Sequence, residues 1–321
     1  MLTSGLIPMG GTPDTSIIIP AHNEESYIED LLSSLCDCKY QNIEIVVVDN
    51  GSTDGTLSIA EKYKCLVVQL SEKAYPSKAR NAGVIASRGK WLVFLDADVI
   101  VSAHWVSRLA QLRGGLLNLP EHYVTGAAYH MSRSPSWLEE YWFEPLRKKL
   151  KSYINGGNIV TTRKTFDLIG GFNSEIETGE DVDFCRRAVE SGIEIIIDDG
   201  WVVYHEGFPK KAKNFVLRER WHGKGDFTGL DQLLSSKMAI ATSVYIALHA
   251  LFAIAILVGY MPLALISSGS VFGLCLARAA KDIKIESMKH FFVCTFVSYL
   301  YFLGRAQSPL LVLFDRFENR S

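Results

Sequence analysis

Acidic side chains follow apolar runs at two points in the first hundred residues. Asp49 follows residues 43–48, and Asp96 and Asp98 follow residues 91–95. Because side chains alternate along an extended backbone, the Asp-Ala-Asp spacing points both carboxylates to one side. Carboxylate oxygens suit a hard divalent cation such as Mg²⁺ or Mn²⁺, and a site with few of them leaves room for diphosphate oxygens. The spacing therefore predicts a candidate site for a divalent cation. The alternative is a solvated strand end.

Glu180 and Asp181 form a second acidic pair, at the start of a helix predicted over residues 180–191. Helix N-termini favour anions, so the pair is compatible with a purely structural role. A carboxylate with an ordinary pKa near an exposed site is ionised at pH 7, as a general base must be. The sequence pattern alone leaves both roles open.

The elements that must position these residues alternate between apolar runs and helical patterns. Unbroken β-branched runs separated by helices predict a parallel sheet covered on both faces, and such sheets bind ligands beyond the carboxyl ends of their strands. Those ends carry His22-Asn23-Glu24, Asp49 and Asp96-Ala97-Asp98, which predicts one shared site. Strands are expected at 16–19, 43–48, 66–70, 91–95, 123–129, 158–162, 193–197 and 201–204, and helices around 28–35, 53–60, 77–87 and 180–191.

From about residue 237 the apolar runs become long and charged residues become few. We expect a tail over 1–14, a catalytic domain over 15–236 and a membrane region over 237–321, with apolar spans at 238–258 and 260–280. Residues 290–314 are compatible with a third span or with an interfacial segment. Arg278, Lys281, Lys284 and Lys289 follow the second span, which predicts that this end and the catalytic domain are cytoplasmic, in a multi-pass protein of the inner or plasma membrane.

The overall charge is nearly balanced. Lys and Arg total 33 and Asp and Glu total 35, for a formal charge of -2. Proteins that bind nucleic acid usually carry a basic surface, so we expect no nucleic-acid partner.

Residues 16–205 resemble the inverting family 2 glycosyltransferases of GT-A fold, which have a Rossmann-like mixed sheet. The resemblance implies metal-dependent transfer of a sugar from a nucleotide-sugar, with UDP as the expected nucleotide. The acceptor would be a polyprenyl phosphate, a glycolipid or a cell-surface glycan. The resemblance is carried, in chain order, by IPAHNEE (19–25), VDNGSTDGT (48–56), ARNAG (79–83), FLDAD (94–98), GGFN (170–173) and GEDVDF (179–184).

The resemblance also implies a role for each matching residue. Asp96 would face the ribose and Asp98 the metal, while Asp181 would deprotonate the acceptor hydroxyl and Glu180 would orient the acceptor. His205 would be a further metal or diphosphate ligand, with a satisfied, partly buried histidine as the alternative. The pocket for the nucleotide would be formed by Pro20, Ala21, Glu24, Asp49, Arg80, Asp96 and Ala97.

Other positions carry expectations for the sugar and the diphosphate. The resemblance puts Gly157 and Asn158 beside the donor sugar and the acceptor. Arg220 and Lys224 would contact the diphosphate from a loop, or else meet anionic lipid headgroups beside the first span. Two other functions also use or tolerate these residues: a metal-dependent nucleotidyltransferase, and a non-catalytic membrane scaffold of a glycan-assembly complex.

Overall fold

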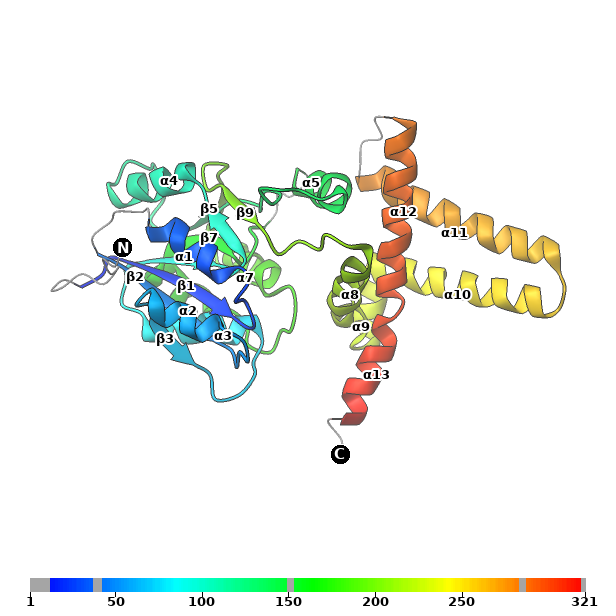
Figure 1. Ribbon diagram of the computed structural model, residues 1–321, viewed down its shortest axis with the longest axis horizontal. Coiled ribbons are helices and arrows are strands. Elements are labelled where there is room, and N and C mark those ends of the chain that lie inside the picture. Colours follow the sequence, from blue (N-terminus) through cyan, green and yellow to red (C-terminus); the bar gives the residue numbers. More distant parts are fainter. Residues whose placement is uncertain (1–11, 37–41, 149–152, 283–286, 319–321) are drawn as a thin grey trace. The chain divides into compact units, whose positions relative to one another are not determined.

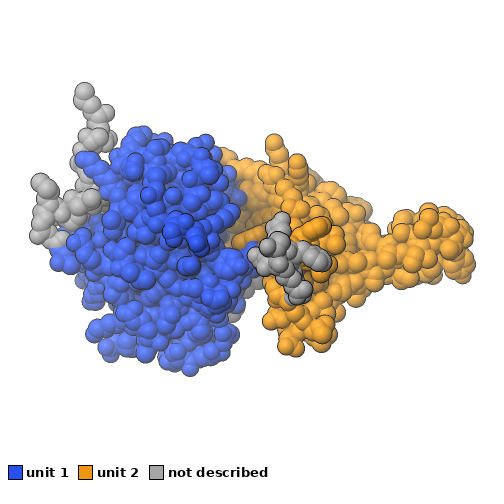
Figure 2. All heavy atoms as spheres, turned by 90° about the horizontal axis from the view of Figure 1, so that it is seen from below, with its two compact units in different colours: residues 1–133, 150–207 blue, residues 134–149, 208–321 orange. Residues whose placement is uncertain are grey.

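The computed structural model describes residues 12–36, 42–148, 153–282 and 287–318 (Figure 1). The chain divides into two compact units, coloured separately in Figure 2. The first unit comprises residues 1–133 and 150–207, and the second comprises 134–149 and 208–321. Most of the predicted tail, and Lys284 of the predicted cytoplasmic segment, lie outside the described residues.

The first unit alternates strands and helices as predicted. Its strands are β1 (Thr15–Ala21), β2 (Ile43–Asp49), β3 (Leu66–Gln69), β4 (Trp91–Leu95), β5 (Val99–Val101), β6 (Tyr123–Gly126), β7 (Asn158–Thr162), β8 (Glu194–Ile197) and β9 (Val203–His205). Its helices are α1 (Ile28–Cys36), α2 (Thr56–Lys62), α3 (Pro76–Ala86), α4 (Ala103–Arg113), α6 (Arg163–Ile169) and α7 (Glu180–Glu190).

The main sheet is mixed, as expected for the GT-A fold. Within the described residues it has the order β3-β2-β1-β4-β7-β6-β8. The four strands β1 to β4 are parallel to one another, β7 is antiparallel to β4 and β6, and β8 is parallel to β6. The carboxyl ends of β1, β2 and β4 therefore meet at one edge, where the polar clusters of the sequence lie.

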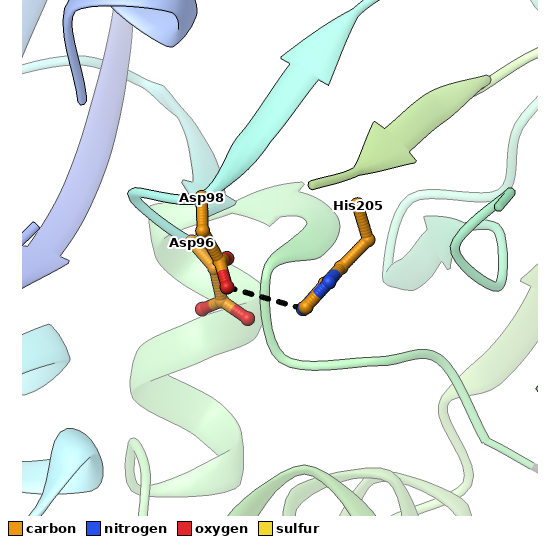
Figure 3. Close-up of side chains that lie close together, drawn as sticks. All are labelled: Asp96, Asp98 and His205. Atoms are coloured by element: carbon orange, nitrogen blue, oxygen red, sulfur yellow. Dashed lines mark ion pairs between the residues drawn. The ribbon is translucent and has the colours of Figure 1, made fainter. Parts of the chain in front are cut away.

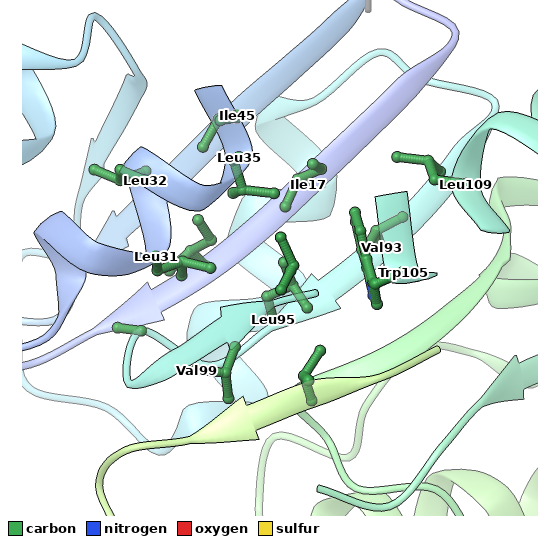
Figure 4. Packing of buried hydrophobic residues seen from close by; sticks show 14 of the residues in the cluster. Ile17, Leu31, Leu32, Leu35, Ile45, Val93, Leu95, Val99, Trp105 and Leu109 are labelled. Carbon is green, nitrogen blue, oxygen red and sulfur yellow. The ribbon is translucent and has the colours of Figure 1, made fainter. Parts of the chain in front are cut away.

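Helices cover both faces of this sheet because alternate strand residues point to opposite sides. On one face, Ile17 and Val93 pack with α1 and α4, which supply Leu31, Leu35 and Trp105 (Figure 4). On the other face, Ile18 and Phe94 pack with residues from α3, α6 and α7. The runs are apolar without alternation because both sides of the strands are buried.

A small second sheet was not predicted from the sequence. β5 begins four residues after β4 ends and pairs with β9 in antiparallel register, which sets Val99 opposite His205. The strand expected over 201–204 begins at Val203, and the Trp201 side chain before it is buried against Trp105, with ring centroids 5.7 Å apart. The strand expected over 123–129 ends at Gly126.

The second unit consists of helices. They are η1 (Glu139–Phe143), α5 (Glu144–Arg147), α8 (Ala212–His222), η2 (Lys224–Phe227), α9 (Leu230–Ser235), α10 (Lys237–Leu257), α11 (Met261–Asp282), α12 (Met288–Arg305) and α13 (Ser308–Glu318).

An aromatic core joins these helices. The Trp142 ring lies 5.5 Å from the Phe215 ring of α8 and 5.0 Å from the Tyr301 ring of α12, measured between centroids. Because α8 and η1 share this core with α12, they group with the C-terminal helices. Residues 208–236 group with the second unit, and their assignment to the catalytic domain stays a prediction.

Two helices in the described part of the chain are long and apolar enough to cross a membrane. They are residues 237–257, with a mean hydropathy of 2.2, and residues 261–281, with a mean hydropathy of 1.6. They form a hairpin in which α10 runs along α11 (Figure 1). The two spans predicted from the sequence coincide with this hairpin, while residues 290–314 fall on two separate helices, α12 and α13.

Candidate active site

Asp96, Asp98 and His205 converge at the end of β4. One ligand atom from each lies within 4.8 Å of the others, and Asp98 Oδ2 is 3.4 Å from His205 Nε2 (Figure 3). The turn between β4 and β5 carries both aspartates, and the pairing of β5 with β9 brings His205 to them from a distant part of the chain. Two carboxylates and one imidazole suit a divalent cation such as Mn²⁺. The predicted metal ligands are thus brought together.

Two glycines allow the backbone to approach these carboxylates. A Cβ atom at Gly157 would overlap the Asp96 carboxylate, and one at Gly207 would overlap the Asp98 carboxylate. Gly157 was predicted to lie near the donor sugar, and it contacts the site through its backbone. Gly207 was not predicted, because its role depends on where β9 delivers the following residues.

Arg80 joins the aspartate cluster to the Glu180-Asp181 pair. Its Nη2 lies 2.6 Å from Asp96 Oδ1, and its Nη1 lies 2.6 Å from Glu180 Oε1. The side chain is 4% exposed, because α3 packs against the sheet at this point. Both terminal nitrogens of Arg80 thus pair with protein carboxylates, and its predicted place in the nucleotide pocket stays a prediction.

Tyr129 is a site residue that the sequence did not reveal. Its hydroxyl donates to Asp96 Oδ2 at 2.5 Å and accepts the N–H of Gly157 at 2.8 Å. Its ring lies 4.7 Å from the His205 ring, measured between centroids. Burial of the Asp96 carboxyl opposes its ionisation, but Arg80, the Tyr129 hydroxyl and His205 together hold its pKa below the usual value.

Asp181 occupies the first turn of α7, where two backbone groups orient it. Its Oδ1 accepts the N–H of Val182 at 2.8 Å, and its Oδ2 accepts the N–H of Gly156 at 3.1 Å. Burial, with a contribution from neighbouring Glu180, raises the pKa of Asp181 to about 6. The value is above the ordinary one expected from the sequence, and it still leaves most of the carboxyl ionised at pH 7, as a base requires.

Glu24 is affected by the charges of the nearby aspartates Asp96 and Asp98. Burial, and then the charges of Asp98, Asp96 and Asp54, raise the pKa of Glu24 to about 8. A raised carboxyl pKa of this origin means that negative charge is crowded at the site. Arg80 is engaged by Asp96 and Glu180. Crowded carboxylates of this kind fit a site for a divalent cation.

The remaining nucleotide-site predictions fall on the same edge of the sheet. Asp49 ends β2 opposite Ala21 of β1, and its Oδ1 accepts the N–H of Ser52 at 3.1 Å. Ala21 and Ala97 are buried side chains of the hydrophobic core, so only their backbone could face a nucleotide. Pro20, on β1, is half-buried.

Asn158 does not fit its predicted role. It is fully buried, its Oδ1 accepts from the Trp105 indole, and its Nδ2 donates to the carbonyls of Ala127 and Trp201. These bonds link the first residue of β7 to Trp105, Ala127 and Trp201. Because the Asn158 side chain is buried and its polar atoms are all engaged, it cannot contact a sugar. Arg220, on α8, and Lys224, on η2, belong to the second unit, and their role toward a diphosphate stays a prediction.

Comparison with known proteins agrees with this fold. Residues 16–164 match the model of the family described as glycosyl transferase family 2. The chain is 25% identical to a pre-mycofactocin glycosyltransferase of Mycobacterium tuberculosis, over 65% of this chain and 46% of that protein, so it spans about half of that relative's length. It is 27% identical to glycosyltransferase AglE of Haloferax volcanii, over 78% of this chain and 82% of that protein.

A solved structure has a related fold. The mannosyltransferase PcManGT from Pyrobaculum calidifontis, determined in complex with GDP-Man and Mn²⁺, superposes with a TM-score of 0.56 at 20% identity, covering 94% of this chain and 88% of that one. The family match, the relatives and the mixed seven-stranded sheet of the described residues lead to one conclusion: residues 16–164 form part of a family 2 glycosyltransferase domain of GT-A fold.

Proposed function

We propose that this protein transfers a sugar from a nucleoside diphosphate sugar, with UDP as the expected nucleotide, to a hydroxyl or phosphate oxygen of a membrane-associated acceptor. The observation that carries the proposal is the link between two carboxylate groups. Asp96, Asp98 and His205 form a cation-binding cluster, and Arg80 ties it to Glu180, the neighbour of Asp181. A leaving-group site and a base are thereby held in one framework.

The chain's own residues divide the work of such a transfer. Asp181 takes the acceptor proton while the acceptor oxygen bonds to the anomeric carbon and the bond from that carbon to the diphosphate breaks. Attack from the side opposite the diphosphate inverts the anomeric centre. The backbone N–H groups of Gly156 and Val182 fix the orientation of the base. An acceptor that is already an ionised phosphate would not need this proton transfer.

Asp98 and His205, with Asp96 beside them, would hold the divalent cation. Such a cation, Mn²⁺ or Mg²⁺, supplies Lewis acidity that neutralises the departing diphosphate. The Arg80 and Tyr129 bonds to Asp96 keep that carboxylate ionised at neutral pH, because both favour its charged form.

The helices of the second unit indicate which class of acceptor the protein uses. Its hairpin of two apolar helices has the length and composition to cross a membrane, which favours a lipid-linked or membrane-located acceptor such as a polyprenyl phosphate, a glycolipid or a growing glycan. In this arrangement the protein is anchored in the inner or plasma membrane, with the first unit on the cytoplasmic side.

The first test is a panel of UDP- and GDP-sugars, each measured with and without Mn²⁺ for thermal stabilisation and for release of the nucleoside diphosphate. A ligand that binds only the native state raises its melting temperature. We expect one donor to give a metal-dependent shift and metal-dependent release. A chain that binds no donor in the panel and releases no nucleotide would instead be the non-catalytic scaffold.

The second test is Asp181→Asn, with Glu190→Gln on the same helix as the control, because Glu190 is exposed and pairs only with Arg186 among the described contacts. We expect Asp181→Asn to lower sugar transfer by about 10²–10⁴-fold, the usual contribution of a general base, and Glu190→Gln to leave it unchanged. Full sugar transfer in Asp181→Asn would exclude Asp181 as the base and would favour a phosphate acceptor, whereas metal-dependent nucleotide chemistry without any sugar transfer in the natural protein would favour the nucleotidyltransferase.

A further inference from the structure

α12 is packed against a helix that is too polar to enter a bilayer. α8 carries Lys213, Arg218, Glu219 and Arg220, and α12 lies along it (Figure 1). A Cβ atom at Gly304 would press on Glu219 and the backbone of Arg220, and Arg305 Nε lies 3.4 Å from Glu219 Oε2. The charged helix α8 cannot enter the hydrocarbon core of a bilayer. Its neighbour α12 therefore cannot cross the bilayer without breaking its contacts with α8.

The opposite side of α12 is nevertheless apolar. Phe292 is 57% exposed and Phe296 is 53% exposed, although buried residues of the same helix face α8 and η1. Along α12 the exposed apolar residues recur every three or four positions and so form one stripe, and α13 adds two further exposed apolar residues; together they are Met288, Phe292, Phe296, Tyr299, Leu303, Leu310 and Phe314. A helix with one apolar side and one polar side is suited to lie in a membrane surface.

The α10–α11 hairpin indicates where the membrane surface lies relative to this stripe. α10 and α11 are joined by the short turn 258–260, so both of their outer ends lie on the same side of any membrane that they enter. In chain order α9 precedes α10, and α12 is the next described helix after α11. Lys237 begins α10, Lys281 ends the apolar stretch of α11, and Lys289 follows at the start of α12, where each ammonium group would meet lipid headgroups.

From these contacts we propose that the stripe on α12 and α13 lies flat in the interface of a phospholipid bilayer, beside the inserted α10–α11 hairpin, and that α12 is not a third span. The chain then enters and leaves the membrane on one side, through two crossings. This arrangement is independent of the sugar chemistry, so the outcome of the transferase assays does not affect it.

Depth-dependent fluorescence quenching tests the proposal on the full chain. An environment-sensitive fluorophore is attached at Phe292→Cys, Phe296→Cys, Tyr299→Cys or Phe314→Cys, with Cys36 and Cys38 replaced by serine. The protein is then placed in vesicles of phosphatidylethanolamine and phosphatidylglycerol that contain quencher lipids. Ile246→Cys, near the middle of α10, is the control for a deep position, and Glu190→Cys on α7 is the control for water.

We expect every stripe label to be quenched more by shallow than by deep quenchers, and the Ile246 label to show the reverse. Labels at Phe296 and Tyr299 that match Ile246 would identify a third span. Stripe labels that match the Glu190 control would show that the stripe is in water or covered by protein, such as a second copy of the chain. Either result overturns the proposal.

Reporter fusions provide a second measurement that needs no substitution. A fluorescent protein that matures only in the cytosol, or a phosphatase that is active only outside it, is fused to either end of the chain in a bacterial host. We expect both ends to report the same side of the membrane, since two crossings return the chain to its starting side. Reports from opposite sides would contradict the proposal.

Discussion

Asp96 and Glu180 are held together by one buried guanidinium. The two carboxylates lie on separate elements, at the end of β4 and at the start of α7, and each is 2.6 Å from a terminal nitrogen of Arg80. The distance along the chain from Arg80 is 16 residues to Asp96 and 100 residues to Glu180. Arg80 therefore couples the proposed leaving-group site to the helix that carries the proposed base.

Replacing Arg80 tests this coupling. In Arg80→Met, Asp96 and Glu180 lose their shared cation inside the fold, and removing one partner of a buried ion pair typically costs about 3–5 kcal/mol of unfolding free energy. We expect a clear fall in the melting temperature of the first unit. Tryptophan fluorescence measures this temperature. Arg186→Met is the control, since the Arg186 side chain is 56% exposed and ion pairs of an exposed arginine contribute about 1 kcal/mol or less. Equal effects in the two variants would contradict the role given to Arg80.

The pKa of Asp181 predicts two effects of pH that have opposite signs. The folded protein raises it from 3.8 to about 6, so protonation of this carboxyl stabilises the fold. That stabilisation is fully present below pH 3.8 and is lost as the pH rises through about 6. Asp181→Asn, which stays neutral, should gain melting temperature relative to the natural protein at pH 7 and gain less at pH 4.

Transfer to a hydroxyl should show the complementary dependence. Because the base must be ionised, kcat/KM is expected to fall about tenfold per pH unit below about 6. A rate that stays level down to pH 4.5, measured with saturating Mn²⁺, would exclude Asp181 as the base.

The sequence was sufficient to predict the parts of the site that follow local rules. The Asp-Ala-Asp spacing at a strand end predicted that Asp96 and Asp98 share a side, and the series of apolar runs and helices predicted the parallel strands and the edge at which Asp49 lies. These features depend on side-chain alternation and on the connection of parallel strands by helices. Both are properties of neighbouring residues.

The unpredicted parts depend on pairing between distant strands. Tyr129 reaches Asp96 from the segment after β6, and Gly207 reaches Asp98 from the segment after β9, and no local pattern encodes either register. Asn158 was misassigned for the same reason. Two glycines before it indicate a turn, while its burial depends on Trp105 and Trp201, which are remote in sequence.

The Tyr129 hydroxyl gives a further test of the site. Tyr129→Phe keeps the ring beside His205 and removes only the hydroxyl that links Asp96 to the Gly157 N–H. A hydrogen bond to a charged group contributes about 1.5–3 kcal/mol, so we expect the affinity for the Mn²⁺–nucleotide complex to fall by about 10- to 100-fold. Tyr204→Phe, on β9, is the control and should leave binding unchanged. A titration in which both variants bind like the natural protein would remove Tyr129 from the site.

Gly157→Ala tests how closely the backbone must approach Asp96. The added methyl would overlap the Asp96 carboxylate, which cannot retreat without giving up its bonds to Arg80 and Tyr129. Overpacking of this kind costs about 1–3 kcal/mol. Because Asp96 is also displaced, we expect metal-dependent transfer to fall much more than stability does.

The matched control is Gly269→Ala, because a Cβ atom at Gly269 meets nothing within 4 Å and α11 favours alanine over glycine. Mn²⁺ binding, sugar transfer and melting temperature are measured for both variants. Loss of Mn²⁺ binding in Gly157→Ala alone would support a metal site built around Asp96. Unchanged Mn²⁺ binding in Gly157→Ala would mean that the metal does not depend on the position of Asp96, and Asp98 with His205 would then have to hold it without that carboxylate.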